Sequence, residues 1–375
     1  MNKSEKVFPP GKYIKDELEK RGWTQTDVAF FLGRSSSVEI NNLITGKKKI
    51  TPEVAQELAA VFSSAPEYWL NLENKYRLTQ IEDVDESINR KVRLFSTFPV
   101  KEILKRNWVE NTEDIEELEK RLFDFLGIKS IDEQPHIAHA AKKSTTYNET
   151  TVNQAAWMIR AYNLAPAVMV AKFSEESLLE AFEKLRLILF NVEEIRHVPR
   201  ILANAGIRFL IVETLSNSKI DGVTFWLDKK SPVIVLSMRF DRIDAFWQAL
   251  LHELDHVKHL EGQDMPIIDS NLIGEGATKA EDKPEFERRA DSFAANFSIP
   301  SKELEKFITR IHPLYTRDKI LGFSARIKVH PGIVVGQLQH EGKIPYSHFR
   351  DFLIKARNII TASALTDGWG NTPLI

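Results

Sequence analysis

The sequence predicts a mostly helical α+β protein built in three parts, which are residues 1–80, residues 81–153 and residues 154–375. The first part should hold five short helices, because amphipathic segments there alternate with helix-capping residues and glycines. The third part should hold a small β-sheet, because three β-branched or aromatic runs lie between residues 207 and 237. Two long amphipathic segments, residues 241–259 and 284–300, predict the helices that follow the sheet.

Composition limits the classes of protein to consider. The chain has 375 residues, a formal net charge of −2 and no cysteine, so it can form several cores but no disulfide and no thiolate metal site. Its first residues, Met1 to Lys6, lack the apolar segment of a secretory signal, and no apolar run reaches the roughly 18 residues of a membrane span. These features predict a cytoplasmic protein without a membrane partner.

The first 80 residues carry a recognisable helical arrangement. Thr24-Gln-Thr-Asp27 is a capping box for a second helix, which Gly33 ends. A third helix, about Ser36 to Ile44, follows after only a few residues, and Thr51-Pro52 opens a fourth. Two short helices joined by a tight turn and embedded in three others describe a helix-turn-helix domain.

The second helix of this motif carries side chains that could touch DNA bases or phosphates, namely Ser35, Ser36, Ser37, Asn41 and Asn42. Lys47, Lys48 and Lys49 follow it, where phosphate contacts are expected. Residues 1–80 contain 12 Lys+Arg and 10 Asp+Glu, a net charge of only +2, and Glu39 lies in the recognition helix. DNA binding should therefore be selective or weak. The alternative is a helical bundle used only for dimerisation.

Three motifs, Gly46-Lys47, Ile50-Thr-Pro-Glu53 and Trp69-Leu-Asn-Leu72, occur within residues 9–78. With them this segment resembles the HigA-type branch of the XRE/Cro helix-turn-helix family. The resemblance implies a regulator that binds an operator in double-stranded DNA. Such modules usually dimerise, so we expect a homodimer and half-sites with two-fold symmetry.

The predicted helix 241–259 contains His252-Glu-Leu-Asp-His256. Histidines at i and i+4 lie on one helix face, so both imidazoles can reach a single Zn²⁺. Glu253 lies near that position without being a ligand, which suits a general base for water. His259 is excluded as a further ligand, because the helix places it about 10 Å along the axis from His252. The alternative is a buried helix that carries two histidines and a salt-bridging glutamate.

The predicted helix 284–300 supplies a third ligand. Glu287 and Asp291 are i and i+4 and share a face, so Glu287 can bind the metal while Asp291 accepts the free N–H of a ligating histidine. Glu285 is the fallback ligand, although it lies two residues out of phase. Both carboxylates could instead be solvated charges beside two neighbouring arginines.

The strand runs, the HExxH helix and the Glu-x-x-x-Asp helix lie within residues 200 to 300. This segment resembles the ImmA/IrrE metallopeptidase domain, a gluzincin-like fold. The resemblance implies one zinc ion per chain, held by His252, His256 and Glu287, with Glu253 as the base. Asp255 departs from the family, where many relatives have a small residue. Its carboxylate could support the ligands or face solvent.

Four side chains after residue 311 are candidate donors to the oxyanion of a tetrahedral intermediate, namely His330, His340, Tyr346 and His348. This region resembles the C-terminal part of fusions between HigA-like and ImmA/IrrE-like domains, in which a short helix, here residues 331–340, packs beside the active site. The alternative for each of the four is a structural role, and their spacing does not choose among them.

The middle of the chain, residues 82–200, is predicted to be mostly helical and carries no recognisable chemistry. Residues 112–126 form an amphipathic helix with an acidic first turn, and residues 174–190 form another. The polar stretch 144–151 is the expected hinge. Our hypothesis is that this region transmits position between the two motif-bearing parts.

These observations predict a DNA-binding transcriptional regulator, antitoxin-like, that carries a zinc-dependent endopeptidase domain. By resemblance, its protein substrate is a repressor, an antitoxin or a toxin partner. The alternative is a non-proteolytic repressor or antitoxin, whose peptidase-like domain binds zinc or a partner toxin without turnover.

Overall fold

The structure is a computed structural model that describes residues 7–80, 86–133, 135, 142–143, 150–274 and 277–373. The chain forms two units, residues 1–89 and residues 90–375, and each is described by itself. Of the predicted hinge, only Thr150 and Thr151 lie within the described residues.

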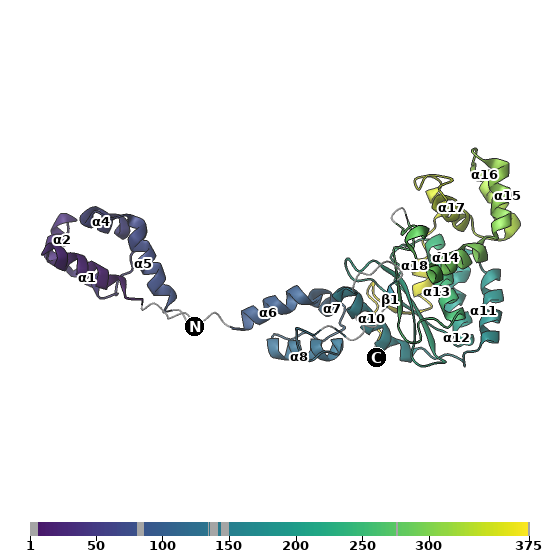
Figure 1. The fold of residues 1–375 in the computed structure, drawn as a ribbon, viewed down its shortest axis with the longest axis horizontal. Coiled ribbons are helices and arrows are strands. Elements are labelled where there is room, and N and C mark those ends of the chain that lie inside the picture. The colour runs from purple at the N-terminus through teal and green to yellow at the C-terminus, as the bar shows by residue number, and fades with distance from the viewer. Residues whose placement is uncertain are drawn as a thin grey trace. The chain divides into compact units, whose positions relative to one another are not determined.

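The N-terminal unit contains α1 (Pro10–Arg21), α2 (Gln25–Phe31), α3 (Val38–Ile44), α4 (Pro52–Phe62) and α5 (Pro66–Leu78) (Figure 1). The predicted capping box is present, because the Thr24 hydroxyl accepts from the Asp27 amide and the Asp27 carboxylate accepts from the Thr24 amide. α3 begins at Val38 rather than at the predicted Ser36, whose hydroxyl accepts from the Val38 amide at 3.2 Å. One core joins the five helices through Ile14, Val28, Ile40, Leu58 and Trp69.

A mixed sheet forms the centre of the second unit, and its six described strands have the order β1-β5-β3-β4-β2-β6. They are β1 (Lys142–Lys143), β2 (Arg208–Val212), β3 (Ile220–Trp226), β4 (Pro232–Leu236), β5 (Ile267–Ser270) and β6 (Leu365–Asp367). β3 is antiparallel to β4 and β5, while β2 is parallel to β4 and β6. β2, β3 and β4 correspond to the three predicted strands.

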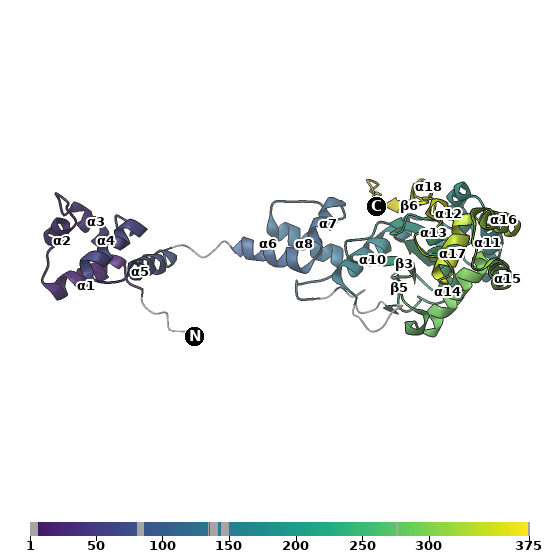
Figure 2. The same ribbon diagram turned by 90° about the horizontal axis from the view of Figure 1, so that it is seen from above.

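Both faces of the sheet are covered, so its central strands are buried throughout. Leu210 and Val212 of β2 join a core on one face, and Phe209 and Ile211 join a core on the other. The first face is covered by α6 (Glu86–Thr97), α7 (Val100–Lys105), α8 (Ile115–Leu126) and α10 (Val152–Leu164). Figure 2 shows α6, α7 and α8 gathered beside α10.

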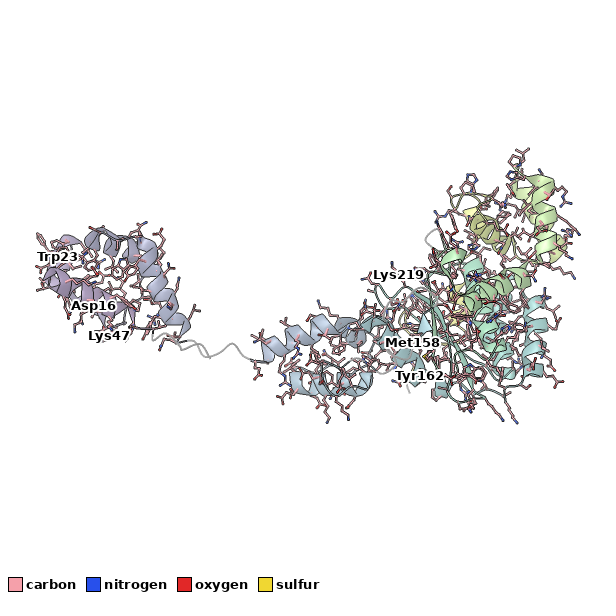
Figure 3. All side chains as sticks on the ribbon, viewed as in Figure 1. Asp16, Trp23, Lys47, Met158, Tyr162 and Lys219 are labelled. Atoms are coloured by element: carbon pink, nitrogen blue, oxygen red, sulfur yellow. The ribbon has the colours of Figure 1, made fainter. Side chains whose placement is uncertain are left out.

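Helix α10 attaches this helical layer to the sheet. Met158 is fully buried, and the Tyr162 ring stacks on the ring of Phe225 in β3 with centroids 4.2 Å apart. Figure 3 labels Met158 and Tyr162. Trp157 donates its indole N–H to the carbonyl oxygen of Val212 at 3.1 Å. The helices that follow the N-terminal unit therefore share a core with the sheet.

The opposite face is covered by α11 (Glu175–Leu187), α12 (Val198–Asn204), α13 (Ile243–Lys258) and α14 (Glu285–Ser298), with α15 (Ser301–Ile311), α16 (Arg317–Ile327), α17 (Pro331–His340) and α18 (Arg357–Thr361). α13 packs against both α14 and α17, and it also touches β3 and β4. The fold is thus α+β and mostly helical, as predicted. Among the described helices, none has both the length and the apolar character of a bilayer span.

Candidate metal centre

Helix α13 places His252 and His256 on its face toward the sheet and α14. Their Nε2 atoms lie 3.1 Å apart, and both side chains are 0% exposed. His252 donates from Nδ1 to Asp291 at 3.0 Å, and His256 donates from Nδ1 to Glu261 at 2.7 Å. With each Nδ1 proton engaged, both Nε2 lone pairs point into one shared space, as the imidazole ligands of one metal ion do.

Two carboxylates from other elements meet these histidines. Glu287 of α14 lies 3.1 Å from His252 Nε2 and 3.7 Å from His256 Nε2. Asp269 of β5 lies 3.5 Å from His252 Nε2 and 3.6 Å from His256 Nε2. The four side chains are fully buried, their ligand atoms lie within 4.8 Å of one another, and they could hold a metal ion. Asp269 was not among the residues predicted from the sequence.

The buried carboxylates of this cluster favour the binding of a cation. No hydrogen-bond donor among the described residues reaches Glu253 Oε1, Glu287 Oε1 or either oxygen of Asp269. Burial and the charge of Asp269 raise the pKa of Glu287 to about 8, and the same two causes raise the pKa of Glu253 well above its usual range. Burial would also raise the pKa of Asp269, but the two histidines outweigh it and lower that pKa. A divalent cation among these N and O donors would balance the carboxylates, and the donor set fits zinc.

Further charged groups hold the histidines in place. Asp291 also accepts from Lys283 at 2.6 Å, so His252, Asp291 and Lys283 form a chain. Glu261 also accepts from Arg289 at 2.6 Å. Burial alone would raise the pKa of Glu261, but its bonds from His256 and Arg289 lower that pKa to about 2.

Asp255 belongs to the same network and does not face solvent. It is 1% exposed and accepts from Arg289 at 2.8 Å. His259 lies at the C-terminal end of α13, where its ring donates to the carbonyl oxygen of Asp255 at 2.8 Å. Asp255 therefore supports the ligands indirectly, through Arg289 and then Glu261.

Glu253 points from α13 toward β3. Its Oε2 accepts from the Thr224 hydroxyl at 2.6 Å, which fixes the orientation of the carboxylate. A Cβ atom on Gly222 would lie 2.1 Å from Glu253 Oε1, closer than real contacts allow. The sequence provides glycine where the strand passes directly over this carboxylate.

The candidate oxyanion donors occupy different places. His330 is the N-cap residue of α17, because its Nδ1 accepts from the Gly332 amide at 3.0 Å, so this side chain has a structural role at the start of the helix. His340 and Tyr346 line a cavity that Asp291 also lines, and Tyr346 donates to the carbonyl oxygen of Gly274 at 3.3 Å. His348 is exposed. The role of these side chains as oxyanion donors stays a prediction.

In the N-terminal unit, Ser35, Ser36, Asn41, Lys47 and Lys49 are exposed, while Ser37, Asn42 and Lys48 are half-buried (Lys47 is labelled in Figure 3). The predicted contact residues thus flank or lie on α3. Lys48 forms an ion pair with Glu39, which also pairs with Arg34 at 2.8 Å. Glu39 therefore neutralises part of the basic surface next to the recognition helix.

Comparisons with known proteins define the class of both parts. Residues 14–69 match the family model described as helix-turn-helix, and residues 204–339 match the M78 peptidase model described as an IrrE N-terminal-like domain. The chain is 34% identical over 73 residues to the uncharacterized HTH-type transcriptional regulator YddM of Escherichia coli (strain K12), a match that covers 20% of this chain and 77% of that protein. It is 35% identical over 73 residues to virulence-associated protein A′ of Dichelobacter nodosus, covering 19% of this chain and 63% of that protein.

The protein is therefore a DNA-binding transcriptional regulator of the helix-turn-helix class that carries a metallopeptidase-like domain. In its N-terminal part the chain belongs to the helix-turn-helix family, and in its C-terminal part it has an IrrE-like peptidase domain. The predicted fusion of these two domains is confirmed. The HigA-type branch within the family remains a prediction.

Proposed function

We propose that this protein binds an operator through its helix-turn-helix domain and cleaves a regulatory partner protein with a zinc-dependent endopeptidase domain. The observation that carries the proposal is the buried cluster between α13 and α14, in which Glu253 lies beside His252, His256 and Glu287. One general base next to a two-histidine, one-glutamate zinc site is the arrangement that a metallopeptidase needs.

A zinc ion held by His252, His256 and Glu287 would supply a Lewis acid that polarises a peptide carbonyl and acidifies water. Glu253 is placed to take the proton of that water, because its Oε1 has no donor among the described residues. Thr224 keeps the other oxygen engaged, so the carboxylate cannot rotate freely. Burial and the charge of Asp269 raise the pKa of Glu253, which makes the carboxylate a stronger base toward that water. Once protonated, Glu253 is placed to return the proton to the leaving amine.

A zinc-binding domain without turnover is the second candidate, and burial favours it. His252, Glu253, His256, Asp269 and Glu287 are all 0% exposed, so a peptide cannot reach them in this conformation. In that case the domain would serve as a zinc-stabilised surface for a partner such as a toxin. The helix-turn-helix domain would then act as a repressor or antitoxin alone.

The two domains together suggest the class of partner protein and the symmetry of the DNA site. A peptidase tied to a DNA site would act on a protein that meets it there, which makes a repressor, an antitoxin or a toxin the expected class of partner. We propose that the N-terminal units pair as a homodimer on a two-fold symmetric site.

The deciding experiment compares the wild type with Glu253→Gln, with Glu285→Gln as the matched control. Glu285 is exposed on α14 and touches none of the proposed ligands. New protein N-termini are mapped in cells that express each variant, and zinc is measured in each purified chain. The proposal expects zinc in all three and a wild-type cleavage product that persists in Glu285→Gln and disappears in Glu253→Gln. Equal cleavage in all three would overturn the protease reading, whereas zinc without any cleavage would favour the second candidate.

A further inference from the structure

The distances around Asp269 are those of a metal ligand. In a tetrahedral zinc site the donor atoms lie about 3.3 Å apart, because Zn–N and Zn–O bonds are about 2.0–2.1 Å long. Asp269 lies 3.5 Å and 3.6 Å from the two histidine Nε2 atoms, and Glu287 lies 3.1 Å and 3.7 Å from the same atoms. Asp269 thus stands in the same relation to the histidines as Glu287 does.

The irregular pairing of two strands directs the side chain of Asp269 toward the two histidines. The pairing of β5 with β3 is irregular between Ile220, opposite Ser270, and Gly222, opposite Asp269. Such a bulge leaves one extra residue, here Asp221, and turns the neighbouring side chains. Asp221 is directed away to Arg239, while Asp269 is directed toward α13 and is 0% exposed.

The two aspartates differ in what satisfies them. Asp221 accepts from Arg239 at 2.9 Å and 3.0 Å and from the Leu272 amide at 2.8 Å, so its charge is balanced inside the protein. Asp269 accepts no comparable hydrogen bonds among the described residues, and its Oδ2 faces the Nε2 atoms of His252 and His256 at 3.5 Å and 3.6 Å. A buried carboxylate without donors costs several kcal/mol unless a cation compensates it. The two histidines can balance the charge of Asp269 only when they are protonated, and as neutral metal ligands they leave that charge to the cation.

We propose that Asp269 is a fourth protein ligand of the metal, so that the centre is closed as folded and must release Asp269 before it can act on a peptide. This inference rests on the proposed zinc site and adds its regulation. Structural zinc sites have four protein ligands, whereas catalytic sites keep one position open for water or substrate. With Asp269 bound, the centre has the four protein ligands of a structural site. When Asp269 leaves as a free carboxylate and water takes its place, the centre has the open position of a catalytic site.

Movement of β5 is the means by which Asp269 can leave. β5 is a short strand between β3 and β1, and the bulge of β3 leaves the end of β5 at Asp269 and Ser270 less regularly paired than its start. Helices α13 and α14 pack closely against each other and carry the other three ligands. A partner that displaces β5 would therefore remove Asp269 and leave His252, His256 and Glu287 in place.

The test uses the full-length protein with Asp269→Ala and Asp269→Asn, and Asp221→Asn as the matched buried-aspartate control. Zinc affinity is measured by competition with a chelator. The metal is then replaced by Co²⁺, whose visible spectrum reports coordination geometry, and sodium azide is added as a probe for an open position. We expect the wild type and Asp221→Asn to give a four-coordinate spectrum that azide does not change. We expect Asp269→Ala to bind zinc about 100-fold more weakly and its cobalt spectrum to respond to azide.

Two outcomes separate the claims. Equal zinc affinity and equal azide response in the wild type and both Asp269 variants would overturn the role of Asp269 while leaving the zinc site intact. Absence of zinc binding in the folded wild type would instead defeat the proposed metal centre itself. If Asp269→Ala does not fold, Asp269→Asn decides, because it keeps the shape of the side chain and removes its charge.

Discussion

Replacing Gly222 by alanine should slow cleavage by on the order of 100-fold while leaving the metal bound. The new Cβ would lie 2.1 Å from Glu253 Oε1, and because contacts below 3.0 Å are not tolerated, the carboxylate has to move by about 1 Å. A displacement of that size in a general base costs on the order of 100-fold in rate. The three heavy atoms nearest the new Cβ all belong to Glu253, and the backbone pairing of Gly222 with Asp269 is kept, so zinc content should not change. The crowding should lower the free energy of unfolding by about 1–3 kcal/mol.

The assay measures cleavage of the partner protein, zinc content and thermal unfolding of Gly222→Ala beside Gly322→Ala. Gly322 lies in α16 with nothing within 4 Å of its missing Cβ, so alanine there should be neutral or stabilise by about 1 kcal/mol. Cleavage at the wild-type rate by a folded, zinc-containing Gly222→Ala protein would refute the placement of Glu253 as the base.

Three further predictions concern charge. Asp291→Asn should weaken zinc binding about 10- to 100-fold because a neutral amide replaces the charged acceptor of the His252 N–H, and an unchanged affinity in chelator competition would argue against that role. The pKa of Glu261 is lowered from 4.5 to about 2, so the stabilising effect of this carboxylate is present above pH 4.5 and is lost as the pH falls through the folded-state value. In acid unfolding, the difference in stability between the wild type and Glu261→Gln should therefore shrink over that pH range. A difference that stays constant would contradict this prediction. Glu39→Gln should free Lys48, raise DNA affinity at low salt and steepen the salt dependence by about one unit in a log–log plot of binding, whereas an unchanged slope would place Lys48 away from phosphates.

The parts of the centre that lie on one helix could be predicted from the sequence. His252 and His256 are four residues apart, so the geometry of α13 alone brings their rings together. The same holds for the capping box of Thr24 and Asp27, which depends on residues three apart. Local spacing carries such features because a helix converts sequence separation into distance directly.

Glu261 and Asp269 were missed because their positions depend on what the chain does after α13 ends. Leu260 adopts a left-handed backbone conformation with φ 55°, and this turn brings the carboxylate of Glu261 to Nδ1 of His256. Asp269 reaches the centre only through the non-local pairing of β5 with β3. The acidic residue that ends the short apolar run Ile267-Ile268 was a weak signal, since a four-residue strand has no distinctive periodicity.

Zinc content is the most direct test of the central claim, that α13 and α14 together form a metal centre. The wild type, Glu287→Gln and Glu285→Gln are purified in parallel, and zinc per chain is measured after equilibration with a competing chelator. The account predicts about one zinc per chain in the wild type and in Glu285→Gln, and its loss from Glu287→Gln. Zinc retained equally by all three proteins, or absent from a correctly folded wild type, would contradict it.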